Sequence, residues 1–244
     1  MGKLKENLVI TRSLNHKHRL LLNRYSILDK QLLIVAKPEH FEIQSIPLDF
    51  YDMEGVFLAM KIIENPVIFL NGGAHAGASQ PHKHLQVVPI DSFSKTGGLH
   101  LDNNVKEYMD RIEIFNRNEK HKLPFFSFKH EIRFFDQPMK ELLFLKNSSQ
   151  KEAVDLLLNL YKEIFKSLGL DYKNPKNDTN VMITQRYLLV IVRSTFSFEN
   201  IRKVQHLPPY RPNTMCYLGL FYSKTESTSN KFKEIGMMNI LKSC

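Results

Sequence analysis

The sequence is poor in cysteine and lacks tryptophan, long apolar runs and any Gly/Ser-rich or Pro-rich linker. Its two cysteines, Cys216 and Cys244, have neither paired nor metal-ligand spacing, so we expect a reducing compartment. No apolar stretch approaches the roughly 18 residues of a membrane span, and the N-terminus lacks the apolar segment of a signal peptide. These absences predict a cytoplasmic protein without a membrane segment.

The composition is that of a folded domain with an excess of positive charge. Hydrophobic residues make up 43% and charged residues 24% of the 244 positions, which argues against disorder. The net charge of +9 favours anionic partners but does not separate nucleic acid from phosphorylated small molecules. We expect one domain over residues 1–244, with a C-terminal subdomain that could begin near residue 173.

Hydrophobic patterning predicts several strands and few helices. Asp49 is a candidate cap for a helix that reaches about residue 64, and Ser149 with Glu152 forms a capping box for a second helix that ends before Gly169. A further helix is expected around residues 105–115. Strands are expected at residues 20–22, 31–36, 66–70, 82–88, 180–184, 187–193 and 214–222. This pattern, without regular alternation, indicates an α+β fold with a mainly antiparallel sheet and flanking helices.

The strand expected at residues 82–88 carries the chemistry. Side chains alternate along a strand, so His82, His84 and Gln86 project from one side and Lys83, Leu85 and Val87 from the other. Two imidazoles and an amide in a row are unfavourable in a core because buried polar groups need partners. They suit the wall of a phosphate pocket.

A glycine-rich loop precedes this strand. The segment from Asn71 to Gln80 contains Gly72, Gly73 and Gly77, which allow close backbone approach to a ligand. Successive backbone N–H groups there can form an anion nest, assisted by the Ser79 hydroxyl and the Gln80 amide. His82 and His84 could instead share a metal ion, but no third ligand is evident nearby, so we assign no metal site.

The segment resembles the active-site motif of the histidine-triad superfamily, in the variant where Gln replaces the third His. It is most similar to diadenosine tetraphosphate phosphorylases, also called ATP adenylyltransferases. The resemblance extends over about residues 20–224, although Arg24 stands where this family usually has Lys and Tyr187 where it has Trp. Further matching segments are Leu22–Tyr25, Leu32–Val35, Gln44, Pro47–Asp52, Asn180–Tyr187 and Arg193-Ser194.

The resemblance implies a histidine-triad-like fold and phosphorolysis of diadenosine tetraphosphate to ATP and ADP. His84 would be the nucleophile that carries the adenylyl group, with His82 and Gln86 as the other catalytic residues. A divalent cation, expected to be Mg²⁺, would arrive with the substrate, and the other partners are diadenosine polyphosphates and phosphate. The implied substrate-binding residues are Arg24, Asn71, Gly73, Gly77, Ala78, Ser79, Gln80, Thr184, Arg186 and Arg193.

Two other classes of function remain open from the residues. One is another enzyme of the superfamily, either a hydrolase that uses water or a uridylyltransferase that acts on sugar phosphates. The second is a non-catalytic binder of nucleotides or nucleic acid that uses the positive charge, and steep salt dependence of oligonucleotide binding would support it. Product identity separates the enzymes from one another.

Overall fold

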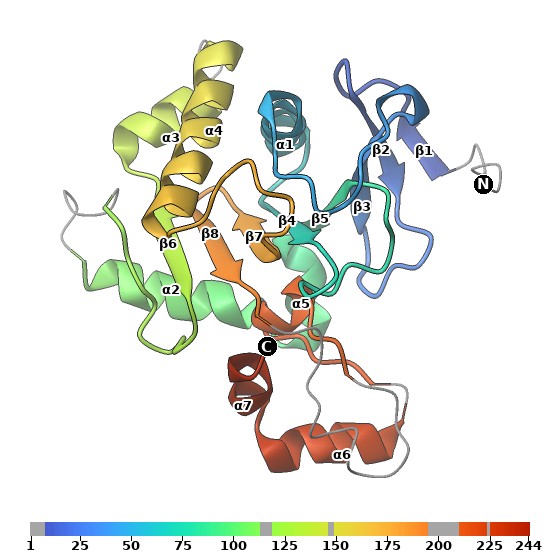
Figure 1. Cartoon of the computed structure of the whole chain (residues 1–244), viewed down its shortest axis with the longest axis vertical. Helices are drawn as coiled ribbons and strands as arrows, with labels where there is room; N and C mark the ends of the chain where they lie inside the picture. Colours follow the sequence, from blue (N-terminus) through green and yellow to red (C-terminus); the bar gives the residue numbers. More distant parts are fainter. Residues whose placement is uncertain (1–7, 113–118, 146–148, 195–209, 224) are drawn as a thin grey trace.

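The computed structural model describes residues 8–112, 119–145, 149–194, 210–223 and 225–244. Within these residues, eight strands form one sheet in the order β1-β2-β3-β5-β4-β7-β8-β6 (Figure 1). Every neighbouring pair is antiparallel, so the predicted α+β fold with a mainly antiparallel sheet is confirmed. The strands are β1 (Val9–Thr11), β2 (His18–Leu22), β3 (Leu32–Ala36), β4 (Pro66–Gly72), β5 (His84–Pro89), β6 (His130–Phe134), β7 (Thr179–Ile183) and β8 (Tyr187–Val192).

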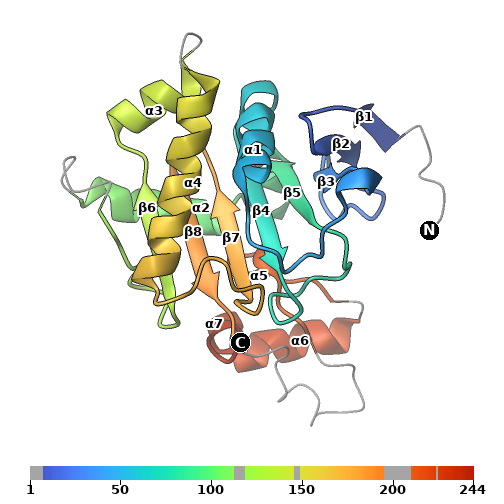
Figure 2. The same ribbon diagram turned by 45° about the horizontal axis from the view of Figure 1, so that its top comes forward.

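Helices cover both faces of the sheet. Figure 2 shows α1 and α4 in front of the central strands and α2 behind them, while α6 and α7 lie at one end. None of the helices in the described ranges is long and apolar enough to cross a membrane. The α-helices are α1 (Phe50–Ile62), α2 (His100–Asp110), α3 (Gln137–Phe144), α4 (Gln150–Ser167), α5 (Thr214–Tyr217), α6 (Glu226–Ile235) and α7 (Met237–Lys242), and two 3-10 helices are η2 (Pro38–His40) and η3 (Ile90–Thr96).

The sheet separates two hydrophobic cores. Leu85 and Val87 of β5 point into the core beneath α1 and α4, together with Ile68 of β4. Phe69 of β4 and Val88 of β5 point into the opposite core, which α2 and α5 cover. This alternation buries both faces of the central strands, and it leaves His84 and Gln86 on the α5 side of the sheet.

Local capping explains where the two long helices begin. The Asp49 side chain accepts from the Asp52 backbone N–H at 2.9 Å, and the Asp52 side chain accepts from the Asp49 N–H at 2.9 Å. This reciprocal pair satisfies free donors at the start of α1. Ser149 accepts from the Glu152 N–H at the start of α4, and Gly169 adopts a left-handed φ of 66° just past its end. Both predicted helix starts are confirmed.

Two expectations for the elements need correction. Residues 214–222 do not form a strand, because the Asn213 side chain caps the short helix α5 by accepting from the Met215 N–H at 3.0 Å. The first residues of this apolar run therefore pack as a helix against one face of the sheet and do not form a further strand. The helix expected at 105–115 is α2, which begins earlier at His100, and residues 113–118 lie outside the described ranges.

Candidate active site

The loop between β4 and β5 is anchored at Asn71. The Asn71 side-chain oxygen accepts from Asn180 Nδ2 at 2.9 Å, from the Thr214 N–H at 2.9 Å and from the Thr214 hydroxyl at 2.7 Å. Asn180 comes from β7 and Thr214 from α5, so one amide joins three elements. Although Asn71 borders the pocket described below, its side-chain oxygen is fully used within the protein, and its role is to shape the loop.

The glycines of this loop are required by its shape. Gly73 and Gly77 have φ values of 105° and 82°, where side chains are strained. A Cβ at Gly73 would overlap the Asp178 carboxylate, and one at Gly77 would lie 2.7 Å from the Asn213 Cβ. Asp178 also accepts from the His75 N–H at 2.7 Å. These contacts fold the loop against the segments before β7 and α5.

Only part of the predicted anion nest is available. The Gly77 and Ala78 N–H groups already donate to the Ala74 and Gly73 carbonyls, at 3.1 and 3.2 Å. The Ser79 and Gln80 N–H groups make no bond to another described residue, and both residues are exposed. The donors left for an anion are therefore at the end of the loop, immediately before the motif.

One ring nitrogen of His84 is hydrogen-bonded within the protein, and the other is not. Its Nδ1 lies 2.9 Å from the His82 carbonyl. A carbonyl can only accept, so Nδ1 carries the hydrogen and Nε2 keeps its lone pair. Among the described residues, none forms a hydrogen bond with Nε2. Burial lowers the pKa of His84, against the opposing effect of the His82 carbonyl, so the imidazole is neutral near pH 7.

The backbone of His84 is held by Gln44. The Gln44 amide oxygen accepts from the His84 N–H at 2.8 Å, and its Nε2 donates to the His84 carbonyl at 3.0 Å and to the Asn71 carbonyl at 3.1 Å. Gln44 is buried at 4% exposure. Its amide therefore bridges β4 and β5 at the point where the two strands diverge around the loop.

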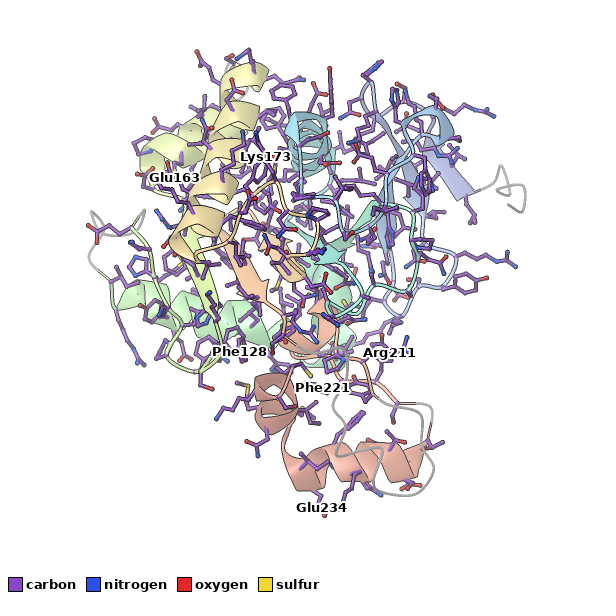
Figure 3. All side chains as sticks on the ribbon, in the orientation of Figure 1. Phe128, Glu163, Lys173, Arg211, Phe221 and Glu234 are labelled. Atoms are coloured by element: carbon purple, nitrogen blue, oxygen red, sulfur yellow. The ribbon has the colours of Figure 1, made fainter. Side chains whose placement is uncertain are left out.

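His84 and Gln86 open onto a cavity of about 730 Å³. This volume is in the range of small-molecule sites. Arg24 and Arg211 supply positive charge to its wall, and Arg211 precedes α5 and lies beside it in Figure 3. No carboxylate is among the described residues of the lining, which are Leu8, Leu21, Leu22, Asn23, Arg24, Tyr25, Ile27, Gln31, Leu33, Asn71, Gly77, Ala78, Ser79, Gln80, His84, Gln86, Arg211, Asn213, Met215 and Tyr222.

Four of the predicted substrate-binding residues do not line this pocket: Gly73, Thr184, Arg186 and Arg193. Thr184 and Arg186 lie in the turn after β7, and β7 runs antiparallel to β4, so this turn is at the opposite end of β4 from the glycine-rich loop. Arg186 pairs there with Asp102 of α2. Arg193 is buried and donates to the Asn180 side chain and the Pro212 carbonyl, both at 2.9 Å. It supports the Asn71 cluster from behind and does not line the cavity.

His82 also lies outside the cavity lining. It pairs with Ile43 in an isolated bridge, and its ring centroid is 5.0 Å from that of Phe41. Burial lowers the pKa of the His82 imidazole, and the Ala36 carbonyl acts in the opposite direction. The contact from His82 to His84 is made by the His82 backbone carbonyl, which any residue at position 82 would keep.

We therefore expect His82→Ala to slow the nucleotidyl transfer predicted from the sequence by up to about 100-fold, the scale of a small misplacement of a reacting group. The loss should be much smaller than that of His84→Ala because the carbonyl acceptor for Nδ1 remains. Steady-state rates of the two variants, each with its melting temperature, check this. A greater loss at His82 with folding preserved would reverse the two roles.

On the other face of the motif strand, Lys83 lies in a buried charge cluster. Its Nζ is 2.5 Å from Asp52 Oδ2, 3.0 Å from Glu42 Oε2 and 2.8 Å from the Pro47 carbonyl. Lys17 reaches Glu42 and Asp49 at 2.9 and 2.8 Å. Glu42, Asp49 and Asp52 are spaced closely enough for a metal ion, but the two ammonium groups already occupy the space between them. The cluster fixes β5 to the start of α1.

Comparison with known proteins adds an independent line of evidence. The family model of the Ap4A phosphorylase N-terminal domain matches residues 4–107, and that of the ATP adenylyltransferase C-terminal domain matches residues 121–244. The chain belongs to the ATP adenylyltransferase family. The predicted resemblance is thereby confirmed, and the first of the two matches contains the complete motif.

Relatives of this ATP adenylyltransferase family member include two proteins of Saccharomyces cerevisiae. Protein APA1 is 24% identical over 96% of this chain and 71% of its own length. Diadenosine 5',5'''-P1,P4-tetraphosphate phosphorylase 2 is 23% identical, over 78% of this chain and 59% of its own length. This chain thus spans less than two thirds of the second relative.

Solved structures share the fold of this family member. The crystal structure of yeast Ap4A phosphorylase Apa2 has a TM-score of 0.69 at 20% identity, covering 99% of this chain and 79% of that one. The structure of Apa2 in complex with Ap4A has a TM-score of 0.67 at 19% identity, covering 98% and 78%. At this identity the likeness concerns the fold, and it agrees with the predicted class.

Sequence reasoning missed several residues of this adenylyltransferase pocket. Gln31 and Arg211 line it, and Asn213 and Tyr222 join them from the C-terminal part of the chain. Gln31 was recognisable only as a polar residue at the start of an apolar strand. Arg211 comes from a segment far from the motif in sequence, and no local pattern in the sequence indicates that the two meet.

Proposed function

We propose that this protein phosphorolyses diadenosine tetraphosphate, with phosphate as acceptor and ATP and ADP as products, through an adenylyl-His84 intermediate. The observation that carries the proposal is the hydrogen bond from His84 Nδ1 to the His82 carbonyl, which leaves Nε2 unbonded on a residue that lines a cavity of about 730 Å³. Membership of the ATP adenylyltransferase family supports the reaction class. The names of the yeast relatives support the choice of substrate.

In the first half-reaction Nε2 attacks the α-phosphorus of one adenylyl group. The bond from that phosphorus to the bridging oxygen breaks, and ATP leaves with the electron pair. The Nδ1–H bond to the His82 carbonyl stabilises the positive charge that the imidazole gains. ATP is a good leaving group, so little acid assistance is needed, and covalent catalysis divides the transfer into two displacements.

Donors near His84 stabilise the charge that develops on the non-bridging oxygens. The unused N–H groups of Ser79 and Gln80 adjoin the Ser79 hydroxyl and the Gln80 amide at the end of the loop. Gln86 follows His84 on the same face of β5. Fixed donors of this kind favour the transition state because they need no rearrangement as charge shifts.

The second half-reaction needs an acceptor that is already nucleophilic. A phosphate oxygen attacks the adenylyl phosphorus, the bond to Nε2 breaks, ADP leaves and neutral His84 is restored. Gln86 does not titrate near neutral pH, so it cannot activate water as a general base. Phosphate is anionic without such help. Arg24 and Arg211, which line the same cavity, are placed to attract it.

A divalent cation, Mg²⁺, would accompany the polyphosphate. The lining offers amide and hydroxyl oxygens but no carboxylate in the described residues, and such a donor set fits a cation that is held mainly by phosphate oxygens. It would neutralise part of the polyphosphate charge as the substrate binds. Residues of this chain would contact the nucleotide and leave the cation to its phosphate ligands.

Incubation with diadenosine tetraphosphate tests the proposal. With phosphate present we expect equal amounts of ATP and ADP, quantified by ion-exchange chromatography. Without phosphate we expect about one ATP per site, an adenylyl group on His84 by peptide mass spectrometry, and slow release of AMP. The reason is that Gln86 provides no general base for water.

His84→Ala protein, purified in parallel, controls for contaminating enzymes and should give neither product. ATP plus AMP at the same speed with and without phosphate would show a hydrolase. If the protein reacted with a nucleoside diphosphate sugar and a sugar phosphate but not with the dinucleotide, it would be a uridylyltransferase. Either result would reject the proposal.

A further inference from the structure

Gln31 contacts the motif from the neighbouring strand. It lies immediately before β3, is only 3% exposed, and its Nε2 donates to the Gln86 side-chain oxygen at 2.5 Å. Leu33 is the direct partner of Gln86 in the β3–β5 pair, so Gln31 is the diagonal neighbour on the same face. Both amides line the cavity.

The direction of both amides follows from one backbone group. The Ile27 N–H, which can only donate, lies 3.2 Å from the Gln31 side-chain oxygen. This oxygen must therefore point to Ile27, and the NH₂ of Gln31 must point to Gln86. An NH₂ can only donate, so Gln86 turns its oxygen toward Gln31. The NH₂ of Gln86 then remains for the cavity.

We propose that Gln31 is a positioning residue that fixes the side-chain amide of Gln86 as a hydrogen-bond donor toward substrate phosphate. The proposal rests on the function proposed above, since it concerns the same transfer. The phosphates within a dinucleotide polyphosphate carry no proton at neutral pH, so their oxygens accept hydrogen bonds and do not donate them. A freely rotating Gln86 amide would present its oxygen to them in part of the population. Gln31 removes that second orientation before substrate binds.

The donor-to-acceptor direction runs through three groups of the protein in a fixed order, from the Ile27 N–H to Gln31 and then to Gln86, whose NH₂ donates to phosphate. Ile27 and Gln31 belong to the connection between β2 and β3, which also carries Arg24. This connection is closed by a bond from the Asn23 N–H to the Gln31 carbonyl at 2.9 Å. The loop that carries the Arg24 guanidinium at the cavity therefore also orients the Gln86 amide beside His84.

Two substitutions at Gln31 test the proposal through the rate of ATP release without phosphate, which isolates the first half-reaction. Gln31→Met keeps the length but removes both bonds, and we expect a roughly tenfold slower rate, the size of one lost bond to a charged group. Gln31→Glu has no N–H, so it accepts from Ile27 and from Gln86. Gln86 then presents its oxygen to phosphate, and the rate should fall by about 100-fold, two such effects together.

A charge-matched control separates orientation from repulsion. Asn23 also lines the cavity and accepts from the Tyr25 N–H at 3.0 Å. Asn23→Asp keeps this bond while adding one negative charge. The fall in its rate of ATP release therefore measures charge repulsion alone. It should be clearly smaller than the loss in Gln31→Glu. Equal losses in the two variants would overturn the orienting role.

A double-substitution cycle decides whether Gln31 acts through Gln86. In a Gln86→Met background, adding Gln31→Met should change the rate by less than twofold, because no amide is left to orient. A tenfold loss in that background, or no loss from Gln31→Met in the wild type, would overturn the inference while leaving the proposed function intact. Melting temperatures of all variants exclude unfolding as the cause. If the wild type forms no adenylyl-enzyme, the proposed function fails and this inference fails with it.

Discussion

Replacing His84 by alanine is expected to lower the rate of adenylyl transfer by on the order of 10⁴-fold or more, the scale seen when an enzyme loses its covalent nucleophile. No other described residue of the cavity lining carries an imidazole, a thiol or a carboxylate that could take its place. The fold should persist, because the imidazole makes one hydrogen bond, to a backbone carbonyl. ATP release and the mass of the adenylated protein measure the effect.

His16→Ala is the matched control, since it removes an exposed imidazole that does not line the cavity. It should retain wild-type turnover. Near-normal turnover in His84→Ala would show that another group forms the covalent bond. A loss of activity with a large fall in melting temperature would instead show that position 84 is needed for the fold.

The same imidazole sets the acid limit of the first half-reaction. Burial lowers the pKa of His84 from its ordinary value of 6.5. The reactive form is neutral, so the burst of ATP should fall as His84 becomes protonated in acid, with its midpoint below pH 6.5. Measuring the burst without phosphate avoids the titration of phosphate itself. An acid limit above 6.5 would contradict the assigned environment.

Lys83→Met is expected to destabilise the protein by about 3–5 kcal/mol, the usual cost of breaking a buried ion pair on one side. Lys83 is 1% exposed and Asp52 is fully buried, so the variant leaves the Asp52 carboxylate without its nearest positive charge. The free energy of unfolding in urea at pH 7 measures this. Lys95→Met, which breaks an exposed pair with Asp29, is the control and should leave the free energy of unfolding nearly unchanged.

Repeating the urea unfolding at several pH values tests whether the ionised Asp52 carboxylate causes the destabilisation. Burial alone would raise the pKa of the Asp52 carboxyl, but a hydrogen bond from His18 and the charges of Lys83 and Lys17 hold it well below its ordinary value of 3.8. A carboxyl whose pKa is depressed in the folded state stabilises that state at pH values above its pKa in the unfolded chain. This stabilisation is lost as the pH falls through the pKa of the folded state. The difference in the free energy of unfolding between wild type and Lys83→Met should therefore become smaller in acid. A constant difference, or a cost similar to that of Lys95→Met, would show that the cluster contributes little.

The sequence predicted the centre of the site because its pattern there is local. Alternation along residues 82–88 places His84 and Gln86 on one face, and the structure has them both on the cavity wall. The cap at Asp49 and the glycines of the loop are likewise read within a few residues. His82 was expected on the same face, but it lies before β5 begins, in a bridge with Ile43.

Predictions that depended on the path of the chain were less successful. Thr184 and Arg186 match the family pattern, but matching residues says nothing about which end of β7 faces the loop. The apolar residues 214–222 read as a strand, and a single Asn213 cap turns their start into α5. Gln31 and Arg211 meet the motif through strand pairing and through the C-terminal segment, and neither contact has a signature in the sequence.

The division of the sheet between the two parts of the chain has a consequence for folding. β5 is completed by β3 and β4, all within residues 4–107, but β4 pairs on its other side with β7 from the second part. A chain that has been synthesised only through β5 therefore has β4 as an open edge strand, with unpaired backbone groups that favour association with other chains. Asn71 lacks Asn180 and Thr214 at that stage. The loop beside the nucleophile can therefore take its final shape only after synthesis has passed α5, so competence for catalysis arises late and together with closure of the sheet.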